Sequence, residues 1–313
     1  MVISTSYLGF DLPNPFIAGA GPLSDTPQHA KQVEDAGAAA IVMHSLFEEQ
    51  VGETASSQPS SSTLSGGVVA QYLEQLCKLK EAVDVPVFAS MNGHTPGPWL
   101  DAATALEQAG ADALELNVYY VATDAEETAV MLEQRAVDMV AEITRAIKIP
   151  LAVKLSPFYT SLAHFARNLE QAGAVGLVLF NRSFAVDIDV GMFKVLSNRE
   201  LSKSNELLLR LRWLSVLASS LDSAKLAVSG GVHSGEDAIK AFICGASAVQ
   251  MVSALLKNGP GHLSKVREEL MQWMEHHEYE SLEQMRSSVN ISRTRTDYMR
   301  LLQSWERLYS GRD

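Results

Sequence analysis

Short runs of apolar residues alternate along this chain with longer stretches in which apolar positions recur at a helical period. Uniformly apolar runs are typical of strands buried on both faces of a parallel sheet, and the periodic stretches predict amphipathic helices. Strands are predicted at residues 14–18, 40–43, 85–90, 113–116, 149–154, 176–180, 225–229 and 248–251. Helices are predicted between them at residues 26–35, 72–82, 98–108, 128–147, 161–171, 206–219 and 236–243. This alternation of strands with helices predicts parallel pairing.

A glycine between two small residues precedes four of the predicted strands. The motif is Ala-Gly-Ala around Gly37, Gly110 and Gly173, and Cys-Gly-Ala around Gly245. Each motif follows a predicted helix, and a glycine in the left-handed conformation commonly ends a helix. Because the strand–helix units fit one domain of this length and the glycine-rich loops come last, the pattern favours a (β/α)8 TIM barrel over a doubly wound open sheet.

We therefore expect residues 1–313 to form a single barrel domain with three additions. Residues 46–69 include a serine-rich run, which predicts a lid-like loop or, alternatively, a disordered linker. Residues 182–204 form an insertion after the sixth strand, and residues 271–313 predict a helical cap outside the barrel.

Composition excludes several classes of function. The formal net charge of −12 disfavours a nucleic-acid surface, which needs clustered Lys and Arg. The only cysteines, Cys77 and Cys244, cannot form a disulfide framework. No apolar stretch approaches the roughly 20 residues of a spanning helix, and the N-terminal residues lack a basic region followed by an apolar run. We expect a cytoplasmic protein that is not embedded in a membrane.

The seventh predicted strand enters a double glycine, Ser229-Gly230-Gly231, and the eighth ends near Val252-Ser253. Glycines at a strand end let backbone N–H groups approach a ligand that a Cβ would exclude. A helix predicted to begin near Ala254 would offer its positive end to an anion, and barrels of this class often bind phosphate at these two loops. The alternative is that the glycines only form two tight turns.

The other predicted strand ends supply candidate chemistry, because active sites of such barrels lie there. They carry Gly19-Ala20-Gly21, His44-Ser45, Ser90-Met91-Asn92, Asn117, Lys154 and Asn181-Arg182. Buried lysines are rare unless paired, so Lys154 is the main candidate; a Schiff-base lysine and a salt-bridged structural lysine are the alternatives. His44, His94 and His233 lack the spacing of metal ligands, and no metal site is expected.

Several motifs together resemble the dihydroorotate dehydrogenase family, in particular its soluble branch. They are Asn14-Pro15-Phe16, Glu115-Leu116-Asn117, Val153-Lys154-Leu155-Ser156-Pro157, Ser229-Gly230-Gly231, Cys244-Gly245-Ala246, Gly259-Pro260 and Glu278-Tyr279-Glu280-Ser281-Leu282. The resemblance covers nearly the whole chain in order. It implies non-covalent binding of FMN at the mouth of the barrel.

The resemblance also implies a role for each matching residue. Ala20 and Gly21 would lie beside the flavin ring, Ser45 near its edge, and Asn117 and Lys154 at its pyrimidine side. The phosphate would be surrounded by Gly230, Gly231, Gly245, Val252 and Ser253. The Lys154 cation would then stabilise negative charge that develops on the flavin during reduction, while Asn117 and Asn181 would hold the substrate.

The sequence departs from the family at the catalytic base. Family members place a Cys or Ser three residues after the motif asparagine, and here that residue is Tyr120. His44 stands where a lysine is expected, Arg182 replaces a small polar neighbour of Asn181, and the lid asparagine motif expected within residues 46–69 is missing.

This departure changes the expected proton chemistry. An ordinary tyrosine has a pKa of about 10, so Tyr120 would mainly donate a proton, which suits reduction of an activated C=C. Oxidation of dihydroorotate would require a lowered pKa, helped by Arg182 or Lys154, or another base such as His44. The alternative is that Tyr119 or Tyr120 points into the barrel wall and transfers no proton.

We therefore predict an FMN-dependent oxidoreductase that moves hydride between flavin N5 and dihydroorotate, or a related CH–CH compound, in pyrimidine biosynthesis. An FMN-dependent reductase of an unrelated activated alkene, a non-catalytic flavoprotein subunit and a Lys154 aldolase are the alternatives. A small-molecule substrate, a homodimer and an electron-transfer partner protein are the expected partners.

Overall fold

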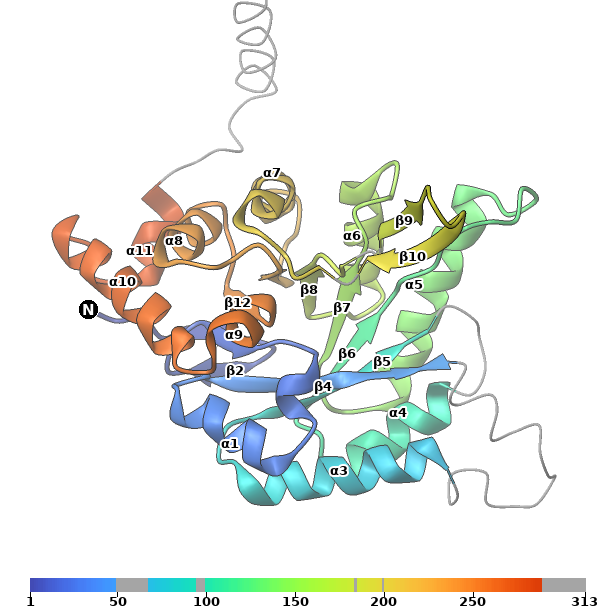
Figure 1. Cartoon of the computed structure of the whole chain (residues 1–313), viewed down its shortest axis with the longest axis horizontal. Coiled ribbons are helices and arrows are strands. Elements are labelled where there is room, and N and C mark those ends of the chain that lie inside the picture. Colours follow the sequence, from blue (N-terminus) through green and yellow to red (C-terminus); the bar gives the residue numbers. More distant parts are fainter. Residues whose placement is uncertain (49–66, 94–98, 183–184, 199, 289–313) are drawn as a thin grey trace, which may run out of the picture.

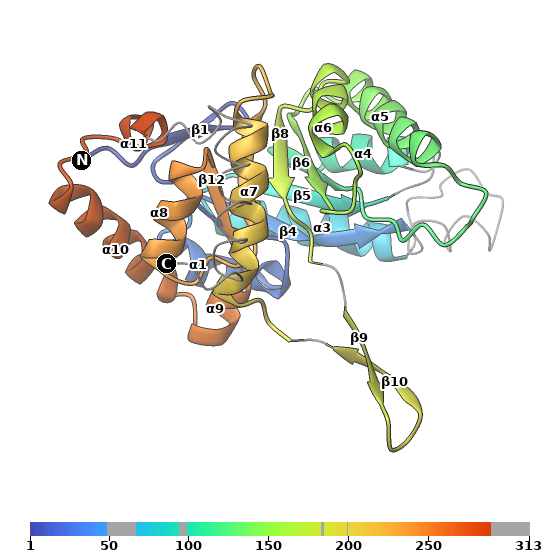
Figure 2. The same ribbon diagram turned by 90° about the horizontal axis from the view of Figure 1, so that it is seen from above.

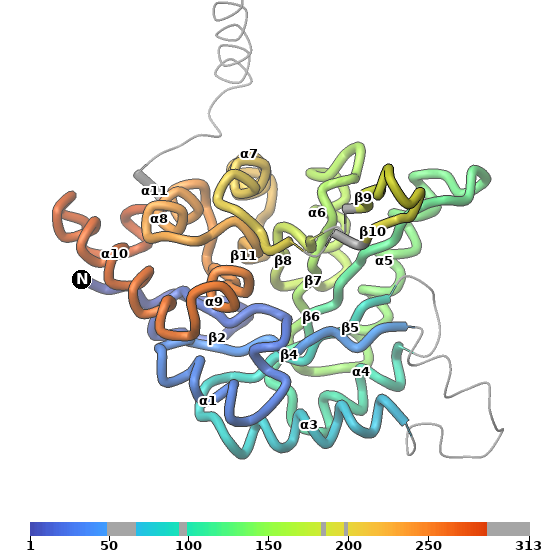
Figure 3. Tube along the Cα trace, viewed as in Figure 1, coloured from blue at the N-terminus to red at the C-terminus, as the bar shows by residue number. Residues whose placement is uncertain are grey.

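The computed structural model describes residues 1–48, 67–93, 99–182, 185–198 and 200–288. Within them, parallel strands form a closed barrel in the order β11-β12-β3-β4-β5-β6-β7-β8 (Figures 1 and 3). The barrel strands are β3 (Phe16–Ala18), β4 (Ala40–Phe47), β5 (Val87–Asn92), β6 (Ala113–Asn117), β7 (Leu151–Leu155), β8 (Gly176–Leu179), β11 (Lys225–Ser229) and β12 (Ala248–Met251). The prediction of a (β/α)8 TIM barrel is confirmed.

Helices follow the barrel strands and cover the outside of the barrel (Figure 1). They are α1 (Pro27–Asp35), α3 (Val68–Ala82), α4 (Trp99–Gln108), α5 (Ala129–Ala146), α6 (Leu162–Gln171), α7 (Leu207–Ala218) and α8 (Gly235–Ile243). Their bounds agree with the predicted ranges to within a few residues. The largest difference among the strands is β4, which continues to Phe47, four residues beyond the predicted end at Met43.

The repeated glycine motif marks helix ends, as predicted. Gly37, Gly110, Gly173 and Gly245 have φ angles of 94°, 95°, 108° and 106°. These are left-handed values that other residues adopt only with strain, so the motif ends four helices and directs the chain into the following strand.

One end of the barrel is closed by a hairpin that the sequence analysis did not predict. Strands β1 (Thr5–Tyr7) and β2 (Phe10–Leu12) pair antiparallel, and Tyr7 and Leu8 join a core cluster with Ala40, Ala113 and Ala248, which begin their barrel strands. A larger cluster packs the helices against the outside of the barrel. The carboxyl ends of the strands are thus left as the end available to a ligand.

The insertion after β8 contains a second hairpin, β9 (Ala185–Asp189) and β10 (Lys194–Asn198). Figure 2 shows it projecting away from the barrel. Its exposed apolar side chains are Val186, Ile188, Val190, Met192, Phe193, Val195 and Leu196. The predicted lid falls almost entirely on residues 49–66, outside the described residues, and stays a prediction.

The described residues near the C-terminus form two helices, whereas residues 289–313 of the expected helical cap lie outside the described part of the chain, so the cap stays a prediction. Helix α10 (His262–His276) begins earlier than expected, and α11 (Leu282–Ser288) follows after Glu278, whose φ is 59°. A bridge between Val2 and Ser281 connects this break to the other end of the chain. No helix in the described part of the chain is both long enough and apolar enough to span a bilayer.

Candidate active site at the barrel mouth

A cavity of about 670 Å³ lies at the carboxyl ends of the barrel strands. Its volume falls within the range of small-molecule sites, about 300–1,000 Å³. It is lined by Ala20, Gly21, His44, Ser45, Phe47, Asn92, Asn117, Tyr119, Tyr120, Val121, Lys154, Asn181 and Arg182. The structure therefore brings together the residues predicted for the ring, the substrate and the proton.

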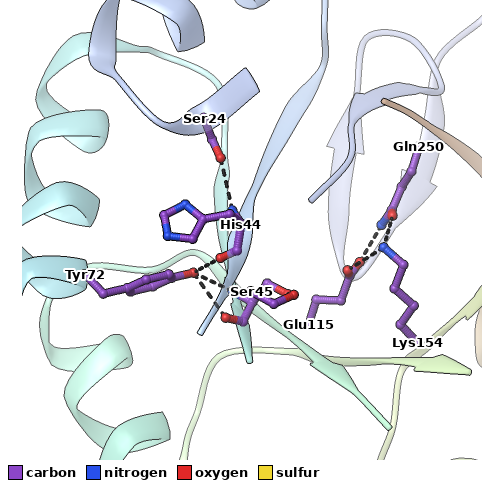
Figure 4. Close-up of polar contacts among 8 residues, drawn as sticks. Ser24, His44, Ser45, Tyr72, Glu115, Lys154 and Gln250 are labelled. Atoms are coloured by element: carbon purple, nitrogen blue, oxygen red, sulfur yellow. Dashed lines mark hydrogen bonds and ion pairs between the residues drawn. The ribbon is translucent and has the colours of Figure 1, made fainter. Parts of the chain in front are cut away.

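Lys154 lies at the floor of this cavity, within a buried triad that joins three strands (Figure 4). Its Nζ is 3.1 Å from Glu115 Oε1 and 3.2 Å from Gln250 Oε1. Gln250 in turn donates from Nε2 to Glu115 Oε2. The three residues are only 5%, 2% and 1% exposed for Lys154, Glu115 and Gln250. The ammonium is thus held at a fixed place in a dry environment, where electrostatic interactions are strong.

Neither partner of Lys154 is among the site residues predicted from the sequence. Glu115 was noted only as part of a family motif, and Gln250 only as part of a strand. A signal was present, because each is a long polar residue inside an otherwise apolar strand, and buried polar groups need partners. The salt-bridged lysine weighed as an alternative is observed, and Lys154 lines the cavity as well.

Asn117 lies beside Lys154 in the register of β6 and β7, and Asn92 lies beside Asn117 in the register of β5 and β6. Asn117 is buried, and its Oδ1 makes no hydrogen bond to any described residue. A buried carbonyl oxygen without a donor is costly. This atom therefore marks a place where a ligand can donate a hydrogen bond.

The end of β4 is fixed by hydrogen bonds from its neighbours (Figure 4). The Tyr72 hydroxyl accepts from Ser90 N at 3.0 Å and donates to His44 O at 2.9 Å, while Ser24 Oγ accepts from His44 N at 3.1 Å. Ser45 Oγ lies 2.8 Å from Ser90 Oγ. Burial raises the pKa of Tyr72, so this hydroxyl stays protonated. The resulting geometry places His44 and Ser45 on the cavity wall.

His44 also has an acidic neighbour. Its Nδ1 is 3.3 Å from Asp25 Oδ1, and both side chains are partly exposed. Nδ1 makes no hydrogen bond to any described residue, so Asp25 acts on the imidazole through its charge. Because His44 lines the cavity, it is a candidate to accept a proton from a substrate bound there.

Tyr120 also lines the cavity, and its hydroxyl donates to Glu127 Oε2 at 2.7 Å. Arg135 pairs with the same carboxylate and lies over the Tyr120 ring, 5.9 Å from its centroid. The hydrogen bond to Glu127, then burial and the charge of Glu127, raise the pKa of Tyr120. The expectation that Arg182 or Lys154 lowers this pKa is not met: the cation that opposes the rise is Arg135.

A second cavity of about 610 Å³ adjoins the first at Tyr119, Tyr120 and Val121, which line both. These residues follow β6 and separate the barrel mouth from a more apolar space beside α5. Tyr120 therefore borders a cavity on each side, and it is not packed into the barrel wall.

The double glycine lies at the end of β11, where Gly230 and Gly231 have φ angles of 82° and 83°. The Gly231 N–H donates to Ser202 Oγ at 3.3 Å, and the Ser202 N–H donates to Ser253 Oγ at 3.1 Å. Ser253 begins α9 (Ser253–Asn258). These contacts bring the loops after β8, β11 and β12 together.

The neighbouring loop after β3 packs closely against Val252. A Cβ on Gly19 or Gly21 would come within 2.9 Å of a Val252 methyl group. The glycines therefore allow the ends of β3 and β12 to approach each other, and the roles predicted for Gly21 and Val252 stay predictions.

Gly245 lies elsewhere, which corrects its predicted place at the phosphate. It ends α8 and precedes β12, so it is at the closed end of the barrel, and a Cβ there would come within 2.5 Å of Ala218. The motif around it resembles the three other helix ends, and a helix end is what it forms.

The fold and this cavity define a (β/α)8-barrel enzyme with its site at the strand ends. The family model described as dihydroorotate dehydrogenase matches residues 2–274. The catalytic subunit of dihydroorotate dehydrogenase B (NAD(+)) from Methanosarcina mazei is 31% identical over 263 residues, 79% of this chain and 82% of that protein. Its counterpart from Thermoplasma volcanium is 29% identical over 293 residues, 90% of this chain and 97% of that protein.

A chain of Aeropyrum pernix, named provisionally as a dihydroorotate dehydrogenase A (fumarate), is 29% identical over 286 residues, 87% of this chain and 92% of that protein. The chain described here belongs to the dihydroorotate dehydrogenase family. It is thus an oxidoreductase that acts on a CH–CH bond.

Proposed function

We propose that this protein uses FMN to move hydride between the flavin and dihydroorotate, or a related compound with a CH–CH bond, in pyrimidine biosynthesis. The observation that supports this most is a cavity at the strand ends that contains a buried ammonium, Lys154, beside a buried amide oxygen without a donor, Asn117 Oδ1. FMN, when bound, would supply the atom that exchanges hydride with the substrate.

The residues of the cavity fit such a ring. Ala20 and Gly21 contribute small residues to the cavity lining, and Ser45 also lines the cavity. Asn117 Oδ1 would accept a ring N–H, and the Lys154 ammonium, held by Glu115 and Gln250, would stabilise negative charge at the ring edge. Asn181 and Arg182 line the part of the cavity where the substrate would lie.

Tyr120 lines the cavity and keeps its proton at neutral pH, which makes it the candidate proton donor, although its raised pKa makes it a weaker acid than an ordinary tyrosine. A phenol that keeps its proton at neutral pH can protonate one carbon of a C=C while hydride reaches the other. This observation favours the second candidate function, reduction of an activated alkene. In the oxidative direction the proton would need another acceptor, and His44 beside Asp25 is the group that the structure offers.

The contacts of Lys154 weaken the aldolase alternative. Schiff-base chemistry needs a neutral amine with an available lone pair. Here the amino group is a hydrogen-bond donor to Glu115 and Gln250 and lies 3.1 Å from the carboxylate.

Relatives that are named catalytic subunits support a partner protein that carries electrons onward. We include this partner, a homodimer and a cytoplasmic location in the proposal.

The test begins with the visible spectrum of the purified chain and titration of the flavin-free form with FMN. Anaerobic mixing with dihydroorotate should bleach the flavin rapidly if the family reaction is retained. Bleaching by other reductants, followed by reoxidation only with an activated alkene, would identify the reductase instead. A chain that binds no FMN would contradict both.

A further inference from the structure

Arg210 is a buried arginine that the reaction described above does not use. It belongs to the first turn of α7, and it is 5% exposed. Its Nε donates to Ser229 O at 2.5 Å, and its Nη1 donates to Glu206 O at 2.7 Å. Both acceptors are backbone carbonyls, so neither neutralises the charge of the guanidinium.

One acidic group, Glu206, only partly offsets the charge of Arg210. Burial lowers the pKa of Arg210; the charge of Glu206 raises it, and the charge of Arg182 lowers it further. The Glu206 carboxylate accepts from Lys203 N at 3.0 Å, and no ion pair joins it to Arg210 among the described residues. Arginine keeps its proton in proteins, and a buried charge without a counter-charge is destabilising.

The third nitrogen of the guanidinium lies at the double glycine. A Cβ on Gly230 would come within 2.9 Å of Arg210 Nη2, and Nη2 makes no hydrogen bond to any described residue. Gly230 is therefore needed to make room for the guanidinium at the end of β11. Arg182 lines the cavity, and its charge lowers the pKa of Arg210, so the two cations lie within electrostatic range of each other.

We propose that Arg210 binds the phosphate of FMN through Nη2, with Arg182 adding positive charge from the cavity side. Guanidinium groups bind phosphate by short, charge-assisted hydrogen bonds, and a dianion would supply the missing counter-charge. This inference rests on the proposed function. It adds a side chain to a phosphate site that the sequence analysis built only from glycines and the two residues after β12.

The test compares FMN with riboflavin, which has the same ring without the phosphate. Dissociation constants are measured by fluorescence quenching on flavin-free protein for the wild type, Arg210→Met and Arg210→Gln. Arg212→Met is the matched control, because Arg212 is exposed on the same helix. We expect FMN affinity to fall roughly 10- to 100-fold in both Arg210 variants, with riboflavin affinity little changed and Arg212→Met like the wild type.

The ratio of the two dissociation constants separates binding from folding. A purely structural role for Arg210 would weaken both flavins equally, and that result would overturn the inference while the proposed function stands. Equal FMN affinity in the wild type and both Arg210 variants would overturn it too. If the wild type binds neither flavin, the proposed function fails and the inference fails with it. Arg210→Gln retains a donor for Ser229 O, so it serves where Arg210→Met is poorly folded.

Discussion

The two ends of the barrel are built on opposite principles. At the closed end, the β1–β2 hairpin inserts Tyr7 and Leu8 among small residues that begin the strands. At the open end, the same strands finish in amides, an ammonium and small residues around a cavity. The closed end gains stability from apolar burial, whereas the open end holds polar groups at fixed places and leaves Asn117 Oδ1 without a donor.

Glu115 lies at the boundary between these two regions. Its carboxylate holds Lys154 on the cavity side, and its charge adds to burial in raising the pKa of Tyr7 on the closed side. One layer of the barrel interior therefore separates a region specialised for stability from a region specialised for chemistry.

Among the substitutions that test this separation of stability from chemistry, we expect the largest effect from substitution of Lys154. Lys154→Met leaves the Glu115 carboxylate buried without its cation, and we expect a loss of about 3–5 kcal/mol in the free energy of unfolding. Hydride transfer should be lost as well. Chemical denaturation and anaerobic flavin reduction measure the two effects.

The double variant Lys154→Met with Glu115→Leu distinguishes structure from chemistry. Replacing both members of a buried ion pair by apolar residues is often neutral, so most of the stability should return while hydride transfer stays lost. Recovery of turnover together with stability would show that Lys154 acts only as a structural residue.

The matching substitution at the closed end is Leu8→Ala. Leu8 is 3% exposed, and its Cδ2 lies 2.4 Å from where a Cβ on Gly176 would be. Removing this side chain leaves a cavity, and we expect a loss of about 2–4 kcal/mol in unfolding free energy. The FMN dissociation constant of the folded variant should not change. Weaker FMN binding would show that the two ends are coupled.

Tyr120→Phe tests the open end with little effect on stability, because the side chain is at the rim. If Tyr120 donates the proton, reduction of an alkene should slow by about 10²-fold or more. Bound-flavin reduction by a dithionite-type reductant is the control and should be unchanged. Unaltered turnover would show that Tyr120 is not the proton donor.

The pH profile sharpens this test, because the pKa of Tyr120 is raised. A donor with a raised pKa stays protonated at higher pH, so activity should fall only above the ordinary tyrosine value of about 10. Glu127→Gln removes the largest cause of the rise, and the alkaline limb should move to lower pH. An alkaline limb that does not move would exclude Tyr120 as the group that titrates.

The barrel could be predicted from the sequence because its signals are local and repeated. Each strand is a short apolar run, and glycine motifs such as those at Gly37 and Gly110 end the helices before them. The hairpins β1–β2 and β9–β10 were missed because strands of three to five residues with mixed polarity have no such repeat.

Lys154 and Asn117 could be proposed as site residues from the sequence because each is a polar residue at the end of an apolar strand, and this signal needs only one position. The triad could not be predicted, because Glu115 and Gln250 are separated by 135 positions in the chain and only the closed barrel brings them together. Gly245 was misplaced for the opposite reason: its motif already had a local explanation as a helix end. Arg210 is one of two arginines on α7, and its burial distinguishes it from the exposed Arg212.

The smallest expected effect is that of Tyr7→Phe at the closed end. The Tyr7 hydroxyl is fully buried and makes no hydrogen bond to a described residue, so removing it should change the unfolding free energy at neutral pH by less than about 1 kcal/mol. Burial, and then the charge of Glu115, raise the pKa of Tyr7. The folded protein therefore keeps this proton at a pH where the unfolded chain releases it.

The consequence is a loss of stability at high pH. Above the unfolded pKa of about 10, unfolding is coupled to ionisation of Tyr7, which at pH 11 lowers the free energy of unfolding by about 1.4 kcal/mol. Tyr7→Phe should recover that amount at pH 11 and nothing at pH 7, as measured by denaturation at both values. FMN affinity should be unchanged at either pH. An equal effect at both pH values would mean that the Tyr7 hydroxyl is not the ionising group, and a change in FMN affinity would mean that the Glu115 layer does not insulate the mouth from the closed end.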